Sequence, residues 1–208
     1  IAGLFGIGGG VIMVPAMFYA LSALGYGEHA MHTAVGTSLA VIIATSTRSV
    51  MAHAQRGAVD FTTLKTWSPW IILGALSGAA IAGFAPGRAL TGIFGVVALV
   101  LSFQFFFGRP ERVLANDLPG LPLRGVLGGF IGVLSSLMGI GGGVFGVTLL
   151  TLCNRPIHQA VATAAGFGVA IGVPGALGFI LSGWGEPGRA PLSLGYVSAP
   201  GFVILAGA

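Results

Sequence analysis

This chain contains very little charge and almost no cysteine. Charged residues make up 7% of its 208 residues, against roughly 25% in an ordinary soluble domain. The single Cys153 excludes an internal disulfide and a metal site built from a cysteine cluster. The basic residues are scattered and form no stripe, so the net charge of +4 gives no reason to expect nucleic-acid binding.

The few carboxylates argue against hydrolytic chemistry. All five lie in polar connections and none in an apolar segment: Glu28, Asp60, Glu111, Asp117 and Glu186. No combination of nucleophile, base and acid is apparent, and no set of metal ligands. We therefore predict that the chain is not an enzyme and has no catalytic residue, metal or cofactor.

What the sequence has in abundance is apolar length and glycine. Hydrophobic residues make up 55% of the chain, the mean hydropathy is +0.97, and the 37 glycines suit close helix packing in lipid. Seven apolar segments are long enough to cross or enter a bilayer, which takes about 20 residues per helix. They cover approximately residues 1–24, 33–55, 66–85, 89–108, 125–153, 157–182 and 191 onward. The predicted fold is an all-α polytopic transmembrane bundle.

Two motifs occur twice in the same order. Gly-Ile-Gly-Gly-Gly occupies residues 6–10 and 139–143, and the stretch from His32 to Thr37 matches the stretch from His158 to Thr163. This repetition predicts a duplicated protein. We expect a first transmembrane repeat at 1–108, a cytoplasmic linker at 109–124 and a second, incomplete repeat at 125–208.

The repeat also predicts the full extent and orientation of the protein. Comparison of the halves places the native start roughly ten residues before Ile1 and a further segment after Ala208, giving four segments in each half. Most basic residues follow the second, fourth and sixth segments, which predicts that those loops are cytoplasmic. Four spans return to the same side, so the repeats are predicted to be parallel. A re-entrant hairpin at the glycine clusters would change this parity, and that alternative stays open.

The glycine clusters are the first candidate binding site. Glycine in a helix interior costs about 1 kcal/mol relative to alanine, and a break there would present a helix N-terminus, which attracts anions. Interrupted segments at corresponding positions of two repeats are typical of transporter sites. The alternative is tight helix packing through small residues. The substrate-binding candidates are Gly8, Gly9, Gly10, Gly141, Gly142 and Gly143.

Polar residues in the second and sixth segments extend this site. Thr37, Ser38 and Thr163 are candidate hydroxyl donors to an anion, unless the threonines bond their own helix backbone. His32 and His158 are candidates for proton coupling, or else lie at the membrane interface. Arg48 is a charge inside a span, either functional or extending to the cytoplasmic interface.

Three places in the chain resemble one known protein family. These are the repeated glycine motif with Val11 and Pro15, the stretch 34–38 (Ala-Val-Gly-Thr-Ser) and the stretch 54–60 (Ala-Gln-Arg-Gly-Ala-Val-Asp). In these places the chain resembles the sulfite exporter TauE/SafE family of bacterial membrane permeases. The resemblance covers nearly the whole chain. It implies about eight hydrophobic segments, a multi-pass location in the bacterial inner membrane, and transport of sulfur-containing anions coupled to an ion gradient.

The expected function is therefore export of sulfite or organosulfonates by alternating access, with the anion bound between the repeats. The expected partners are this small anion, the lipid bilayer and a coupling proton. Two alternatives stay open, an anion channel and a structural membrane subunit without transport activity. The sequence leaves open the exact substrate, import or export, the coupling ion and the oligomeric state, with a homodimer as one alternative.

Overall fold

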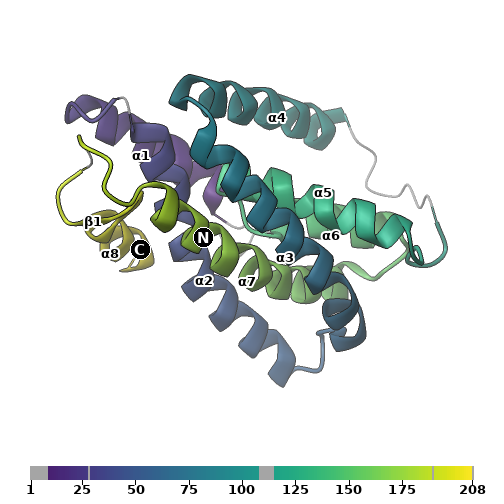
Figure 1. The fold of residues 1–208 in the computed structure, drawn as a ribbon. Helices are drawn as coiled ribbons and strands as arrows, with labels where there is room; N and C mark the ends of the chain where they lie inside the picture. The colour runs from purple at the N-terminus through teal and green to yellow at the C-terminus, as the bar shows by residue number, and fades with distance from the viewer. Residues whose placement is uncertain (1–8, 28, 108–114, 189, 208) are drawn as a thin grey trace.

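A computed structural model describes residues 9–27, 29–107, 115–188 and 190–207, and within these ranges the chain is almost entirely helical (Figure 1). The helices are α1 (Gly10–Ala23), α2 (Ala30–Gln55), α3 (Phe61–Phe84), α4 (Gly87–Phe107), α5 (Leu123–Met138), α6 (Gly143–Leu152), α7 (Ile157–Ser182) and α8 (Ala199–Gly207). A short antiparallel pair, β1 (Ser193–Leu194) and β2 (Val197–Ser198), precedes α8. The sequence did not predict this pair.

Four of these helices, α2, α3, α4 and α7, are long and apolar enough to cross a membrane. Large apolar side chains are exposed on the outside of the bundle, including Phe84, Leu99 and Phe106 at 92%, 73% and 84%. Such a surface suits contact with lipid, because hydrocarbon tails are as apolar as the side chains. The bounds agree with the predicted segments at 33–55, 66–85, 89–108 and 157–182.

Local sequence explains where several helices begin and end. Asp60 caps the start of α3 by accepting a hydrogen bond from the Thr63 N–H at 2.9 Å. Pro156 directly precedes α7. Gly139, with a φ of +66°, follows α5 in the left-handed conformation that glycine adopts without steric cost.

Helices α5 and α6 form a hairpin. The ion pair between Asp117, just before α5, and Arg155, just after α6, has a nitrogen–oxygen distance of 2.8 Å. The Ala115 N–H donates to the Leu152 carbonyl at 3.2 Å. Both ends of the pair therefore lie at the same face of the bundle. This differs from the predicted single interrupted span at 125–153, because the chain turns back at the glycines and does not continue across.

The turn at Gly139 also changes the relation between the halves. Gly36 of α2 lies beside Phe179 of α7, Gly172 lies beside Ile43, and Gly168 lies beside Ser46. Residue numbers rise along α2 as they fall along α7, so the two helices are antiparallel. Parallel repeats would give these corresponding helices the same direction. The predicted parallel arrangement is therefore wrong for this pair, because a hairpin returns the chain to the face it came from.

Glycines allow the tightest helix contacts. Gly74 of α3 packs against the Gly129 backbone of α5, and Gly132 packs against Ile71 and Ala75. A Cβ at Gly78 would lie 2.7 Å from the Val133 carbonyl oxygen. Figure 1 shows α3 and α7 side by side across the bundle, with α4 at its edge. Small residues at these contacts let the backbones approach closely.

The loops define two faces. Face A lies around His29, Pro86 and Tyr196, which line one pocket. Face B lies around Asp60, Asp117 and Arg155. The α5–α6 hairpin begins and ends at face B, and its glycine turn lies inside the bundle, where residues 139–142 are buried.

Candidate functional site

The second glycine segment lies in the interior against three other helices. A Cβ on Gly139 would lie 3.0 Å from both Val14 of α1 and Val35 of α2. Gly10, the first residue of α1, packs directly on the Gly139 backbone. The structure thus brings together Gly9 and Gly10 of the first cluster with the second cluster. Gly8 lies outside the described residues.

The depth of this contact follows from its neighbours on the long helices. A Cβ on Gly141 would lie 3.2 Å from the Ile42 side chain, and one on Gly142 would lie 2.5 Å from the Phe167 Cβ. Ile42 and Phe167 lie near the midpoints of α2 and α7, which have 26 residues each. At 1.5 Å per residue such helices are about 39 Å long. The hairpin turn therefore lies near the middle of the bundle.

Two helices begin at this point without a side-chain cap. Helix α1 starts at Gly10 and α6 starts at Gly143, the last glycine of each cluster, and neither receives a capping hydrogen bond from a side chain. The first N–H groups of any helix lack partners within the helix and carry its partial positive charge. The two glycine clusters thus place two electropositive helix starts in the interior.

Ser38 connects α2 to the hairpin turn. Its hydroxyl is buried and donates a hydrogen bond to the Gly139 carbonyl oxygen at 2.7 Å. The sequence predicted Ser38 as a donor to an anion. In this conformation the hydroxyl is engaged with the glycine turn, so it holds the hairpin tip against α2.

Thr37 and Thr163 occupy matching positions in the antiparallel pair α2 and α7. The Thr37 hydroxyl accepts a hydrogen bond from the Ser198 N–H at 2.9 Å, and the Thr163 hydroxyl accepts one from the Asp60 N–H at 3.0 Å. Each threonine therefore holds the residue that directly precedes a helix of the other half, α8 in one case and α3 in the other. The alternative that each threonine bonds its own helix does not describe these contacts.

A third sequence repetition, in addition to the two predicted from the sequence, lies at these matching contacts. Gly57-Ala-Val-Asp60 corresponds to Gly195-Tyr-Val-Ser198. Gly57 and Gly195 both have positive φ, of 66° and 55°. Asp60 accepts from the N–H three residues later, and Ser198 does the same from Gly201 at 3.3 Å. The shared pattern is a glycine three residues before a capping side chain. Such a short pattern is not distinctive in the sequence, and the matching hydrogen bonds reveal it.

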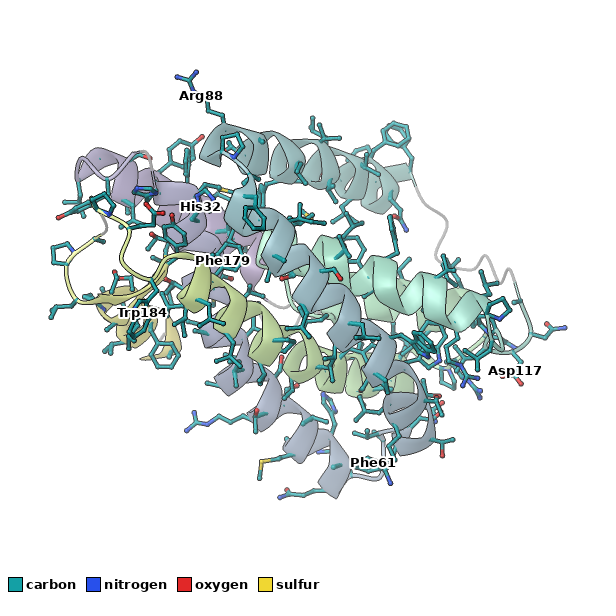
Figure 2. All side chains as sticks on the ribbon, viewed as in Figure 1. His32, Phe61, Arg88, Asp117, Phe179 and Trp184 are labelled. Carbon is teal, nitrogen blue, oxygen red and sulfur yellow. The ribbon has the colours of Figure 1, made fainter. Side chains whose placement is uncertain are left out.

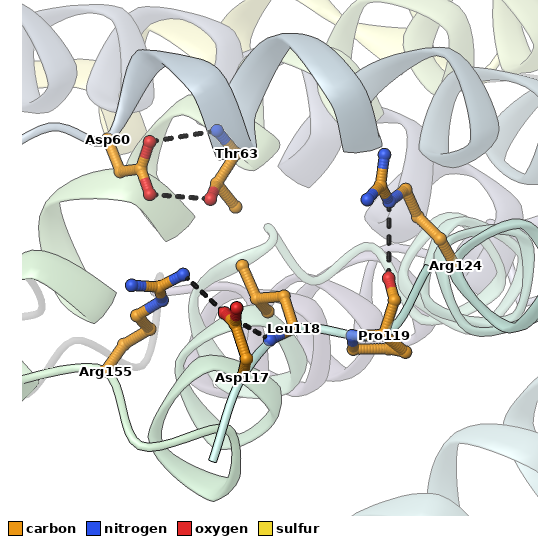
Figure 3. Close-up of polar contacts among 7 residues, drawn as sticks. All are labelled: Asp60, Thr63, Asp117, Leu118, Pro119, Arg124 and Arg155. Carbon is orange, nitrogen blue, oxygen red and sulfur yellow. Dashed lines mark hydrogen bonds and ion pairs between the residues drawn. The ribbon is translucent and has the colours of Figure 1, made fainter. Parts of the chain in front are cut away.

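Asp60 lies in a small polar cluster at face B (Figure 3). Its two carboxylate oxygens accept from the Thr63 N–H at 2.9 Å and from the Thr63 hydroxyl at 2.6 Å. Burial raises the pKa of the Asp60 carboxyl, but the hydrogen bonds from Thr63 and the positive charge of Arg155 outweigh this effect and leave the pKa below its usual value. The carboxylate is therefore ionised near neutral pH and serves as a helix cap.

Replacing Asp60 by alanine is expected to lower the stability by about 1 kcal/mol, the usual effect of losing a helix cap. Because the folded-state pKa is lowered, the contribution of the carboxylate is present above its unfolded-state pKa of about 4 and is lost as the pH falls through the lower folded value. Thermal unfolding in detergent between pH 3 and pH 7 measures both effects. Asp117→Ala is the control, since Asp117 is 80% exposed and its ion pair contributes little. Equal losses in the two variants at pH 7 would contradict the capping role.

Ser135 and Ser136 are buried polar residues that the sequence did not indicate. Both lie in the last turn of α5, immediately before the glycine turn, and both are fully buried. Neither hydroxyl has a hydrogen-bond partner. The Ser136 hydroxyl lies 3.1 Å from where a Cβ on Gly175 would be. Buried hydroxyls are normally paired, so two adjacent unpaired ones at this depth suggest a ligand.

Two other predicted residues lie away from this cluster. Arg48 is exposed on α2, ten residues beyond Ser38 or about 15 Å along the helix. His158 is exposed in the first turn of α7. His32, its sequence counterpart, is buried at 5% exposure against the end of α3. The two histidines therefore share a motif but not an environment.

The interior cluster consists of hydroxyls, glycine backbone and helix N-termini. The Asp, Glu, Lys and Arg residues in the described part of the chain lie elsewhere: Asp60, Asp117, Glu186, Arg48, Arg56, Lys65, Arg88, Arg124 and Arg155. Within the described residues, no three histidine, cysteine or acidic side chains are grouped to hold a metal. Such a donor-rich, uncharged site can stabilise an anion through N–H and O–H groups.

The chain is similar to several transporter proteins. It is 36% identical over 203 residues to a protein of Haemophilus influenzae named "Probable membrane transporter protein". The matched region covers 96% of this chain and 76% of the relative. A protein of Methanocaldococcus jannaschii with a similar name is 27% identical, over 98% of this chain and 75% of the relative. A third, from Bacillus subtilis, is 27% identical over 74% and 65% of the two chains.

No solved structure matches the chain. The family model described as "Sulfite exporter TauE/SafE" matches residues 1–208. The apolar helices and these relatives identify a multi-pass membrane protein of a transporter family. The chain therefore belongs to the sulfite exporter TauE/SafE family.

Proposed function

We propose that this protein is a carrier for small sulfur-containing anions such as sulfite or organosulfonates, and that it binds them at the interior glycine cluster. The observation that carries the proposal is that two helices without a side-chain cap begin beside one interior turn, where Gly10 packs on the Gly139 backbone and Gly143 follows the turn. The unpaired hydroxyls of Ser135 and Ser136 belong to the last helical turn before Gly139. Helix N-termini favour negative charge, and hydroxyls donate to anion oxygens. The family description supplies the sulfur chemistry of the substrate.

The electrostatics of the cluster favour an anion over a cation or a neutral solute. A fixed carboxylate would repel an oxyanion, and the carboxylates in the described part of the chain lie at the faces of the bundle. Each helix start contributes roughly half a positive charge, and the effect is larger away from water. Gly9 and Gly10 with Gly141 to Gly143 then provide N–H donors, while Thr37, Ser38 and Thr163 hold the surrounding helices together. Gly8 belongs to the same motif by sequence. Arg48 acts outside the cluster, at the approach from face B.

The proposed carrier moves by alternating access between inverted repeats, residues 1–108 and 125–208. Three features support inversion: α2 and α7 are antiparallel, Thr37 and Thr163 make matching contacts, and both glycine clusters end at a helix start. Inverted repeats interconvert two equivalent conformations, each open to one face. A pocket of about 860 Å³ lies at face A, whereas the pocket at Asp60 and Thr163 on face B has no room for a water. We take the face A pocket as the entrance of the proposed carrier.

Basic residues assign face B to the cytoplasm. Among the described lysines and arginines in or next to the loops, Arg56, Lys65, Arg124 and Arg155 lie toward face B, and Arg88 lies toward face A. Cytoplasmic loops carry an excess of such residues. The hairpin changes the number of crossings, but the proposed cytoplasmic side of the α2–α3 connection is the one predicted from the sequence.

Flux of sulfite and sulfoacetate into proteoliposomes, with purified full-length protein and with or without an imposed pH gradient, tests the proposal. Saturable flux that depends on the protein and responds to the gradient is expected. Flux far above carrier turnover with no saturation would indicate a channel. A folded protein that moves neither anion would contradict the proposed function and favour a structural subunit.

A further inference from the structure

The pocket at face A is lined in part by polar residues that do not belong to the interior cluster. Its volume is about 860 Å³, and its polar lining includes His29, His32, Thr91 and Tyr196. The His32 ring stacks on the Tyr196 ring, with 4.9 Å between the ring centroids. The centroids of the His32 and Phe179 rings are 6.5 Å apart (Figure 2). His32 precedes Ser38, which bonds Gly139, by six residues, so the pocket begins about 9 Å outward from Ser38 along α2.

Hydrogen bonds determine which nitrogen of His32 carries the proton. Its Nε2 lies 3.0 Å from the Ala85 carbonyl oxygen and 3.2 Å from that of Ala82. A carbonyl oxygen only accepts, so Nε2 must be the N–H donor. The Nδ1 of the neutral ring is then an acceptor, and it is buried with no partner. The ring is thus anchored to the end of α3 through one nitrogen, and the other nitrogen has an unused lone pair.

Protonation of His32 would convert Nδ1 from an unpaired acceptor into an unpaired donor on a cation. A buried charged donor without an acceptor is strongly unfavourable. An oxyanion in the pocket would supply both the acceptor and the opposite charge. Because Nδ1 is shielded from solvent in this conformation, the lining must move to admit that acceptor, which links proton binding to anion entry.

We propose, building on the proposed function, that the face A pocket receives the transported oxyanion and that His32 binds a proton together with it. The proton comes from the solution at face A and adds to Nδ1, and the new N–H donates to an anion oxygen. His158 does not share this role, because it is exposed at the opposite end of the bundle. The pair of matching histidines therefore yields one proton site.

Among the described residues that line this pocket, His32 is the one buried histidine or carboxylate. The end of α3 presents only the carbonyls of Ala82 and Ala85. His29 precedes α2 and contacts the Tyr196 hydroxyl through Nδ1 at 3.3 Å. Glu186 and Arg88 also line the pocket, and Figure 2 shows the Arg88 side chain extending away from the bundle. From α7 and α1 the neighbours are Phe179 and Phe18, which are uncharged.

Binding of sulfoacetate to the full-length protein in detergent, measured by calorimetry from pH 6 to pH 8, tests this proposal. Sulfoacetate is used because its acid groups stay ionised over this range, whereas sulfite itself titrates. The wild type is expected to lose affinity by up to about tenfold per pH unit on the alkaline side and to take up a proton on binding. His32→Gln, which keeps an amide donor for the two carbonyls, should bind with no pH dependence. His158→Gln should behave as the wild type.

Several outcomes would overturn the proposal while leaving the carrier function in place. One is that sulfoacetate binding by His32→Gln depends on pH as in the wild type. Another is that this pH dependence is lost in His29→Gln but not in His32→Gln. In both cases the wild type still transports sulfoacetate. Nitrogen NMR of the wild type gives a test that needs no variant: one of the four histidines should become imidazolium when sulfoacetate is added at pH 7. No change in any histidine overturns the proposal. Failure of the wild type to transport either anion overturns the proposed function itself.

Discussion

Replacing Ser136 by alanine is expected to weaken anion binding by about 10- to 100-fold without destabilising the protein. The hydroxyl is fully buried and has no partner, so in the absence of a ligand it contributes no hydrogen bond to the fold. A hydrogen bond to a charged group contributes about 1.5 to 3 kcal/mol, and each 1.4 kcal/mol is about tenfold in affinity. Removing an unpaired buried hydroxyl should leave stability unchanged or slightly higher. Ser135→Ala is expected to act in the same direction.

The opposite responses of binding and stability make this test specific. Sulfoacetate affinity is measured by calorimetry and stability by thermal unfolding of the same detergent-solubilised variants. Ser77→Ala is the matched control, because Ser77 is exposed on α3 and donates to the Leu73 carbonyl of its own helix at 2.8 Å. Unchanged affinity in a Ser135→Ala, Ser136→Ala double variant would show that the anion does not bind at the end of α5.

Replacing Gly142 by valine is expected to reduce transport by roughly 100-fold or more while the protein still inserts into the membrane. A Cβ here would lie 2.5 Å from the Phe167 Cβ, 2.9 Å from the Phe167 carbonyl carbon and 3.0 Å from the Gly168 nitrogen. Two of these atoms are backbone, so no rotamer change relieves the overlap and the hairpin tip must move away from α7. A displacement of about 1 Å at a binding site can lower the rate about 100-fold.

Gly129→Val separates this effect from a general cost of adding bulk to the hairpin. Gly129 is also in the hairpin, on α5, but a Cβ there would meet nothing within 4 Å. This control should insert and transport as the wild type does, with protein levels measured in membranes and flux in proteoliposomes. Wild-type flux in Gly142→Val would rule out close contact between the hairpin tip and α7 as a requirement for transport.

The positions of the long helices could be predicted because hydropathy is a local property. An apolar stretch as long as 157–182 is expected to be helical in lipid, because an α-helix pairs its backbone groups within the segment and a transmembrane strand is much shorter. The path of residues 125–153 could not be predicted in the same way. Whether the chain crosses at Gly139 or turns back depends on contacts with Val14, Val35 and Phe167, which are distant in sequence.

Some residues of the candidate site were indicated by the sequence, and others became apparent only from the packing. The repeated motifs pointed to Gly10 and the second glycine cluster as candidates, because glycines are unusual in an apolar helix. Ser38 became a candidate because it follows Thr37. They did not identify Ser135 or Ser136, since an isolated serine pair in an apolar helix is common and only burial without a partner distinguishes it. Sequence symmetry also suggested equal roles for the two histidines, although packing makes one buried and the other exposed.

The sequence by itself determined that this is a multi-pass helical membrane protein with two related glycine clusters, because composition and motif spacing are properties of the chain. The tertiary structure alone decided that α5 and α6 form a hairpin, that α2 and α7 are antiparallel, and which hydroxyls are left unpaired. The physical reason is that helix formation in a membrane depends on neighbouring residues, whereas helix direction and hydrogen-bond partners depend on packing between segments that are distant in sequence, 38 residues apart for Asp117 and Arg155 and 101 for Ser38 and Gly139.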